Sequence, residues 1–102
     1  MSLKPDDTIR VVAAIDSLAQ TGPSLGRPLV DTIKMSRHPR MKELRPATSL
    51  RILFAFDQRR AAILLIGGDK RGQWSDWYRV MVPLADALYD DHLETLRRDG
   101  LL

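Results

Sequence analysis

Cysteine is absent from this sequence, and aromatic side chains make up only 6% of its 102 residues. The lack of cysteine excludes disulfides and thiolate metal sites and fits a reducing compartment. Long apolar runs are missing too, since none approaches the roughly 20 residues that span a bilayer. The first residues also lack the apolar core of a signal peptide. We therefore expect a cytoplasmic protein that forms one domain over residues 1–102 and does not contact a membrane.

Metal-binding and nucleophile motifs are also missing. The two histidines, His38 and His92, lack the spacing of metal ligands, and we interpret His92 as a structural residue. No GxSxG turn is present to expose a catalytic serine. The GGDK segment at 67–70 lacks the full phosphate-loop pattern and is interpreted as a turn after a strand. The sequence thus predicts neither a metal nor a cofactor.

Basic side chains are concentrated in the middle of the chain. Residues 34–79 carry 11 basic and 4 acidic side chains, whereas residues 1–33 carry 3 and 4, and residues 80–102 carry 2 and 5. The formal net charge of +3 therefore hides a strongly basic central segment. Such a segment is typical of nucleic-acid binders, although a solvated cationic surface has the same composition.

The chain begins with an amphipathic helix and a long loop. Apolar side chains recur at helical spacing over residues 6–20, which predicts one core-facing side. They are Ile9, Val12, Ile15 and Leu18. Residues 23–40 are rich in glycine, proline and small polar side chains. We expect them to form an ordered loop that contains a short extended piece at 29–33.

Three strands are predicted in the basic segment, at residues 41–45, 50–57 and 61–66. Alternation of apolar side chains in the second predicts one strongly buried face. The third is continuously apolar, which is typical of a central strand covered on both faces, and Gly67 and Gly68 are expected to end it. The short links favour an antiparallel meander.

Residues 75–98 are predicted to be helical, with an interruption at Pro83, because proline removes a backbone donor and clashes with the preceding turn. An apolar stripe of the second part should face the core. It comprises Leu84, Leu88, His92, Leu93 and Leu96. Together the elements predict an α+β fold: an N-terminal helix, a three-stranded antiparallel sheet and a broken C-terminal helix.

Cations on or beside the predicted strands form a candidate catalytic set: Lys42, Arg45, Arg51 and Lys70. RNA can be cleaved without a metal when its own 2′-hydroxyl attacks the adjacent phosphate. The protein then positions the backbone, moves a proton and stabilises extra negative charge. Arginine suits the last task through its planar donors, and a lysine with a lowered pKa can accept a proton. The alternative is a set of solvent-facing cations, with Lys42 and Arg45 in weak surface pairs with Glu43.

Strand geometry limits how many of these cations can share one site. Side chains alternate along a strand, so Lys42 and Arg45 should point to opposite faces unless a bulge intervenes. We expect Arg51 and Lys42 to belong to the site and Arg45 to be the doubtful member.

A further group is predicted to bind RNA bases or phosphates: Arg37, His38, Arg40, Arg71, Trp74 and Tyr78. Aromatic side chains among cations can stack on bases. For Trp74 and Tyr78 the alternative is core packing at the start of a helix. For His38 the alternative is an ordinary loop residue.

Several short blocks, taken in order, resemble the phage-derived HigB-like branch of the RelE/ParE toxin superfamily. The blocks are KELR (42–45), RILFAF (51–56), GGDK (67–70), and WY (77–78) followed by PLAD (83–86). The resemblance covers about residues 8–98. It implies a RelE-like toxin domain of a type II toxin–antitoxin pair, in which the family's usual first strand is absent from this chain.

The resemblance further implies metal-independent cleavage of ribosome-bound mRNA and a helix-turn-helix antitoxin as partner. It assigns charge stabilisation to Arg51 and proton acceptance to Lys42 or Lys70. Two other functions stay open: inhibition of DNA gyrase, as in the ParE branch, and an inactive remnant that still binds antitoxin. The absent strand would leave a sheet edge exposed, at which we expect self-association.

Overall fold

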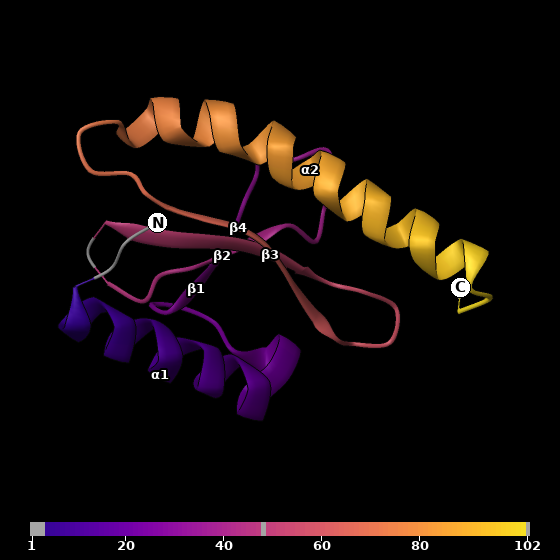
Figure 1. Cartoon of the computed structure of the whole chain (residues 1–102), viewed down its shortest axis with the longest axis horizontal. Helices are drawn as coiled ribbons and strands as arrows, with labels where there is room; N and C mark the ends of the chain where they lie inside the picture. The colour runs from indigo at the N-terminus through magenta and orange to yellow at the C-terminus, as the bar shows by residue number, and fades with distance from the viewer. Residues whose placement is uncertain (1–3, 48, 102) are drawn as a thin grey trace.

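The computed structural model of the chain describes residues 4–47 and 49–101. An antiparallel sheet lies between two helices, so the α+β class is confirmed (Figure 1). The elements are α1 (Pro5–Thr21), the short 3₁₀ turn η1 (Gly22–Ser24), β1 (Val30–Thr32), β2 (Lys42–Leu44), β3 (Leu50–Phe56), β4 (Ala62–Asp69) and α2 (Trp74–Arg98).

The sheet has four strands, in the order β1-β2-β3-β4, and not the three that were predicted. The additional strand, β1, is the extended piece expected within the loop, and it pairs with β2 through Val30 opposite Leu44. The predicted end of the last strand was also wrong. Gly67 and Gly68 continue the pairing of β4 with β3, where they lie opposite Ile52 and Arg51.

The buried central strand is β3. Six of its seven residues are buried, on both faces of the sheet. The continuously apolar segment was predicted to be central, yet β4 is an edge strand and Leu64 is 43% exposed. Its apolar run has another cause: one face of β4 packs against α2, and the other lines an open apolar groove.

α1 packs on one face of the sheet, but not through all of the predicted positions. Ala14 and Leu18 are buried in a cluster with Phe54. Ile9 and Val12, which were expected to face the core, are 67% and 53% exposed. The predicted helix was therefore correct. Apolar residues occur on more than one side of α1, however, and helical spacing alone cannot identify which of those sides faces the sheet.

α2 covers the other face of the sheet and continues through Pro83, so the predicted break was wrong. Pro83 lies on the exposed side of the helix, where the carbonyl that loses its partner can bind water. On the opposite side Val82 and Ala85 are fully buried against the sheet. This packing outweighs the loss of one backbone hydrogen bond.

The apolar stripe predicted on α2 is only partly buried. Leu96 is buried and Leu93 packs against the core, as expected. Leu84 and Leu88 instead point away from the sheet and are 48% and 42% exposed. The residues that anchor the helix are mainly Trp77, Val82, Ala85 and Tyr89.

Candidate active site between the sheet and the first turns of α2

Strand alternation decides which of the predicted cations meet. In β2, Leu44 packs on the α1 side of the sheet, so Lys42 points to that side and Glu43 points towards α2. In β3, Leu53 packs on the α2 side, and Arg51 shares its face. Glu43 and Arg51 therefore meet beneath α2, and Lys42 does not join them.

A chain of two hydrogen bonds joins three elements at this position. Lys70, directly after β4, donates from Nζ to the Tyr78 hydroxyl over 3.1 Å. Tyr78, in α2, donates in turn to Oε2 of Glu43 in β2 over 2.6 Å. Glu43 and Lys70 are 3% and 6% exposed, so both charged groups are buried.

Two arginines approach the same carboxylate. Arg45 donates from Nε to Oε1 of Glu43 over 2.8 Å and from Nη2 to Asp31 over 3.0 Å. The Nε atom of Arg51 lies 3.9 Å from Oε2 of Glu43. Nη1 of Arg51 donates to the backbone carbonyl of Leu50 over 2.8 Å, which fixes the guanidinium group at the start of β3. Glu43 thus holds cations from several directions.

The surroundings shift the pKa of both proton-carrying groups. Burial and the nearby guanidinium group of Arg51 lower the pKa of Lys70, although the Glu43 carboxylate opposes the shift. Burial and the hydrogen bond to Glu43 raise the pKa of Tyr78. The Lys70 ammonium also lies 4.2 Å from the ring centre of Trp74. A lysine that loses its proton more easily, bonded to a neutral phenol, is suited to proton transfer.

Of the residues predicted to bind RNA, Trp74 and Tyr78 belong to this cluster. Trp74 is 55% exposed, so its ring covers Lys70 and faces solvent. Arg71 is exposed beside it, with Nη2 3.9 Å from Asp69. These side chains surround the cluster at its accessible edge.

Arg37 and His38 lie elsewhere and fasten their loop to α2. The Arg37 guanidinium group pairs with Asp90, and His38 Nε2 lies 2.8 Å from Oδ1 of the same carboxylate. The hydroxyl of Ser36 donates to the buried Asp86 one turn earlier. These contacts give both predicted RNA-binding residues a structural partner within the chain.

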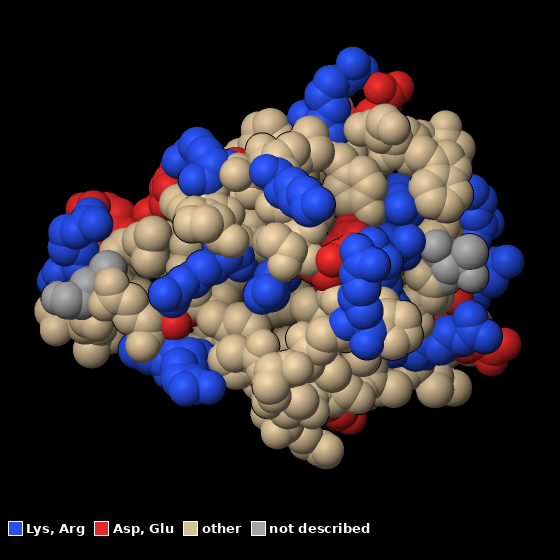
Figure 2. Space-filling view, turned by 180° about the vertical axis from the view of Figure 1, so that it is seen from behind, with Lys and Arg blue, Asp and Glu red and all other residues tan. Residues whose placement is uncertain are grey.

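Lys42 belongs to a separate group of cations. With Arg40 and Arg60 it lines a hollow of about 360 Å³ whose floor includes Phe56 and Asp57. Within the described residues, none of the three cations lies within ion-pairing distance of a carboxylate. Figure 2 shows Lys and Arg side chains spread across the rear face of the molecule.

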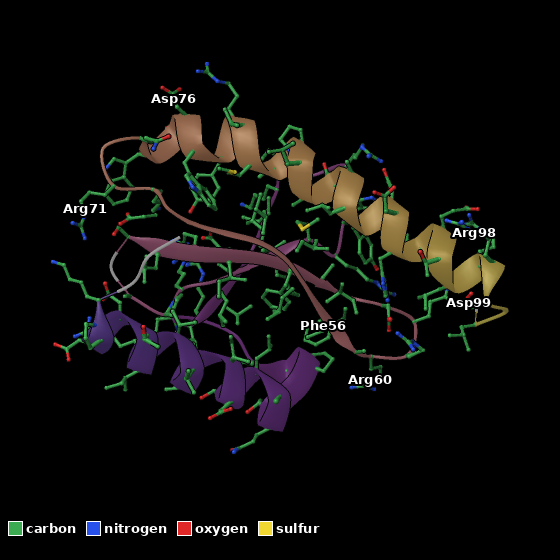
Figure 3. All side chains as sticks on the ribbon, viewed as in Figure 1. Phe56, Arg60, Arg71, Asp76, Arg98 and Asp99 are labelled. Atoms are coloured by element: carbon green, nitrogen blue, oxygen red, sulfur yellow. The ribbon has the colours of Figure 1, made fainter. Side chains whose placement is uncertain are left out.

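The basic residues outside the cluster are widely spaced along the molecule. Arg60 lies in the turn between β3 and β4, whereas Arg71 lies at the other end of the sheet, before α2 (Figure 3). The predicted cations therefore form two groups and not a single site: Arg45, Arg51 and Lys70 beneath α2, and Lys42 with Arg40 near the β3–β4 turn.

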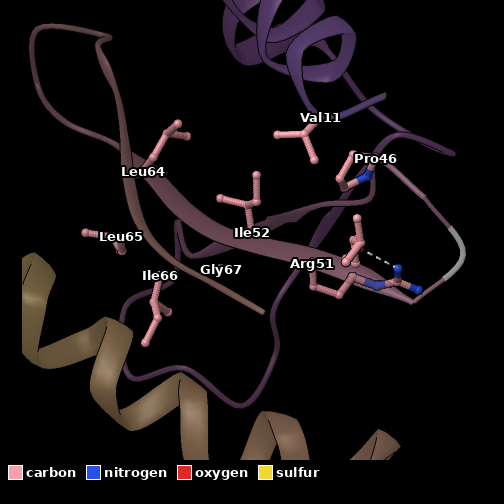
Figure 4. A pocket seen from close by; sticks show the side chains of 9 residues that line it. Val11, Pro46, Arg51, Ile52, Leu64, Leu65, Ile66 and Gly67 are labelled. Carbon is pink, nitrogen blue, oxygen red and sulfur yellow. Dashed lines mark hydrogen bonds between the residues drawn. The ribbon is translucent and has the colours of Figure 1, made fainter. Parts of the chain in front are cut away.

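An apolar groove of about 230 Å³ lies on the α1 side of β3 and β4 (Figure 4). Val11, Ile52 and Leu64 contribute to its wall, and Arg51 lies at one end. Because the other lining side chains carry no titratable group, the groove is not suited to proton transfer. We therefore do not place the chemistry there.

Glu43 is the residue that the sequence reasoning missed as a site member. It entered only in the alternative, as a weak surface partner of Lys42 and Arg45, yet it is buried at the centre of the cluster. Strand alternation contained the signal, since Glu43 shares its face with Met41, which is fully buried. A carboxylate on a buried face needs partners, and nearby cations supply them.

Two kinds of feature are absent from the residues that the structure describes. Residues 4–47 and 49–101 contain no group of three or more His, Cys, Asp or Glu side chains placed to hold a metal ion. Neither described helix combines the length and apolar character that crossing a membrane requires.

Comparison with known proteins places the chain in a family. Residues 1–90 match the family model described as phage-derived protein Gp49-like. "Putative toxin HigB3" of Mycobacterium tuberculosis is 56% identical over 100 residues, covering 97% of this chain and 88% of the relative. "Putative toxin HigB2" of the same organism is 51% identical over 87 residues, covering 81% of this chain and 43% of the relative.

The chain thus matches most of one relative and less than half of the other. No solved structure gives a significant match. The family match and the two relatives confirm the resemblance to HigB-like toxins, and the chain belongs to the family of phage-derived Gp49-like proteins.

Proposed function

We propose that this chain is the toxin of a toxin–antitoxin pair and that it cleaves RNA at the cluster beneath α2. The observation that carries the proposal is the hydrogen-bonded chain from Lys70 through Tyr78 to Glu43, with Arg45 and Arg51 beside it. The names of the two relatives support the toxin role and an antitoxin as partner. We also propose that the antitoxin is a helix-turn-helix protein, as the resemblance implies.

The cluster contains groups for each step of cleavage by the RNA's own 2′-hydroxyl. Lys70 in its neutral form takes the proton of that hydroxyl as the 2′-oxygen bonds to phosphorus. As the bond from phosphorus to the 5′-oxygen breaks, the Tyr78 hydroxyl turns from Glu43 to that oxygen and gives it its proton, while Lys70 passes the proton it has taken up to the Tyr78 oxygen. The products carry a 2′,3′-cyclic phosphate and a 5′-hydroxyl, and the enzyme returns to its starting protonation state.

The arginines supply the electrostatic part of the mechanism. Extra negative charge develops on the phosphate oxygens as the 2′-oxygen attacks, and guanidinium groups held in advance stabilise it. Glu43 keeps Arg45 and Arg51 in place and does not itself contact the RNA. Arg45 is the more accessible of the two, with its side chain 34% exposed.

The exposed side chains of Trp74 and Arg71, at the accessible edge of the cluster, offer a way for RNA to reach the buried groups. A base stacked on the exposed face of Trp74 would bring its phosphate next to Lys70, which lies under the same ring. Lys42 and Arg40, on the other side of β2, would hold the backbone further along the strand by charge alone. In this proposal the catalytic cations and the cations that contact the RNA backbone are two separate groups.

The experiment that tests the proposal incubates the purified chain with RNA, with and without ribosomes, and maps the cut sites and their chemical ends. We expect cuts with 2′,3′-cyclic phosphate ends that persist in EDTA and are lost in Arg51→Ala. A folded wild-type chain that cuts neither free nor ribosome-bound RNA would overturn the proposal. A gyrase supercoiling assay on the same preparation then tests the ParE-like alternative, and antitoxin binding without either activity identifies a remnant.

A further inference from the structure

α2 carries a second row of apolar side chains on the side that faces away from the sheet (Figure 1). Val80, Leu84 and Leu88 follow one another at intervals of four residues and are 56%, 48% and 42% exposed. Pro83 and Ala87 are exposed between them and complete a continuous apolar strip. We call these five residues the outer stripe.

The outer stripe is not needed to hold α2 on its own sheet. Val82, Ala85 and Tyr89, on the opposite side of the helix, are almost fully buried and perform that task. A surface helix of a monomer usually has one apolar side and one polar side. α2 has two apolar sides over the same turns, which is typical of a helix covered by a partner.

The spacing of the outer stripe fits a helix as the covering element. Val80, Leu84 and Leu88 form a ridge of the i, i+4 type, and Pro83 and Ala87 form a second, lower row beside it. Two such surfaces interdigitate when the helices cross at about 50°. The stripe extends about 12 Å along the helix axis, the length over which two crossing helices touch.

We propose that a second copy of this chain covers the outer stripe, with its α2 antiparallel to the first across a two-fold axis near Leu84. The charges at the two ends of the stripe select this occupant. Arg79 precedes the stripe and Asp91 follows it, and both are exposed. In an antiparallel pair, Arg79 of each copy lies near Asp91 of the other, so the surface is complementary to itself.

The remaining contacts of these two residues agree with this arrangement. The Asp91 side chain has no ion-pair partner in the described part of the chain, and Arg79 pairs only with its exposed neighbour Asp76. A parallel pair would place like charges together and lose both contacts. Because the stripe is short, we expect reversible association in the micromolar range and not an obligate dimer. This proposal does not depend on RNA cleavage.

Sedimentation velocity of the full chain from about 1 to about 100 µM tests the proposal, since a reversible dimer shifts with concentration. The wild type is expected to move from monomer towards dimer across this range. Leu84→Glu should remain monomeric, which corresponds to a loss of affinity of at least about 100-fold. Val12→Glu is the matched control, because Val12 is equally exposed and apolar but lies on α1, and it should dimerise like the wild type.

Reversing the charges of Arg79 and Asp91 provides a second measurement, and because both positions are exposed these substitutions should not disturb the fold. Arg79→Glu alone and Asp91→Arg alone each place like charges at both contacts, so each should weaken the dimer. An equimolar mixture of the two variants restores opposite charges at both contacts, so it should form a heterodimer close to wild-type strength.

Three outcomes would overturn the proposal. One is a wild-type chain that stays monomeric throughout, including the case in which only a partner protein protects the stripe. Another is a Leu84→Glu variant that keeps its fold by circular dichroism and dimerises like the wild type, which would move association to another surface such as the β4 edge. The third is a mixture of charge variants that remains as weak as its components.

Discussion

The hydroxyl of Tyr78 donates a hydrogen bond to the buried carboxylate of Glu43 over 2.6 Å, between residues 35 positions apart in the sequence. This bond connects the first turns of α2 to the second strand of the sheet. It also sets the direction of the next bond, because a Tyr78 hydroxyl that donates to Glu43 must accept from Lys70.

Replacing Tyr78 by phenylalanine removes both bonds and leaves the ring. We expect a loss of about 1–2 kcal/mol in the free energy of unfolding and a fall in RNA cleavage of at least about 100-fold, because the proton relay is broken. Urea unfolding and single-turnover cleavage measure the two effects. Tyr89→Phe is the control, because the Tyr89 hydroxyl donates to the Phe56 carbonyl away from the cluster. It should lose similar stability and keep its activity; equal loss of activity in both variants would argue against the relay.

Gly68 and Gly67 allow a test of the packing between β4 and α2. A Cβ atom added at Gly68 would lie 2.8 Å from Nε1 of the buried Trp77, whereas one added at Gly67 meets its nearest atom at an ordinary 3.5 Å. Gly68→Ala should therefore lower the free energy of unfolding by about 1–3 kcal/mol, and Gly67→Ala by much less. Thermal unfolding of the two variants compares them. Equal effects would mean that the approach of Trp77 to β4 is looser than described.

The contrast between these glycines shows what the sequence could reveal and what it could not. Alternation and helical spacing predicted the order of helices and strands, because they depend on neighbours in the chain. They could not show that Gly67 and Gly68 extend β4, since that depends on pairing with β3. The position of β4 at the sheet edge likewise depends on strand order, which local patterns do not contain.

The candidate site, too, could be predicted from the sequence only in part. Strand parity correctly predicted that Lys42 and Arg45 point to opposite faces, but it could not say which face carries the cluster. Our expectation favoured Lys42, and the structure brings Arg45 together with Arg51 instead. The choice was fixed by Glu43 and Tyr78, whose contact spans two distant elements. The catalytic roles themselves remain predictions.

Asp57 provides a prediction about pH. Burial raises its pKa, but hydrogen bonds from Arg59, His92 and two backbone N–H groups outweigh burial and lower the pKa from 3.8 to about 2. A lowered folded pKa means that the ionised carboxylate stabilises the fold. The contribution is complete above pH 3.8, is lost as the pH falls from 3.8 towards 2, and corresponds to about 2 kcal/mol.

Asp57→Asn should therefore cost about 2 kcal/mol in the free energy of unfolding at neutral pH, and the difference from wild type should shrink as the pH falls through the window between about 4 and about 2. Urea unfolding over this pH range measures it. Asp16→Asn, at an exposed position of α1, is the control and should change little at any pH. A deficit for Asp57→Asn that stays constant down to pH 2 would contradict the assignment.

The cations of the second group predict a different signature. Lys42→Ala, Arg40→Ala and Arg60→Ala should each weaken binding to a non-cleavable RNA and lower the slope of log affinity against log salt by about 1. Fluorescence anisotropy at several salt concentrations gives these slopes. Arg97→Ala, which removes a cation paired with Glu94 at the end of α2, should leave the slope unchanged. Unchanged slopes in the first three variants would exclude this face as a backbone contact.

The most direct test of the central claim is single-turnover cleavage of one RNA by wild type and Lys70→Met, with analysis of the product ends. The methionine keeps the length of the side chain and removes its charge and its proton. We predict 2′,3′-cyclic phosphate ends from the wild type and at least about a 100-fold slower cleavage by a variant that remains folded. Cleavage by Lys70→Met at the wild-type rate, with the same ends, would contradict the account.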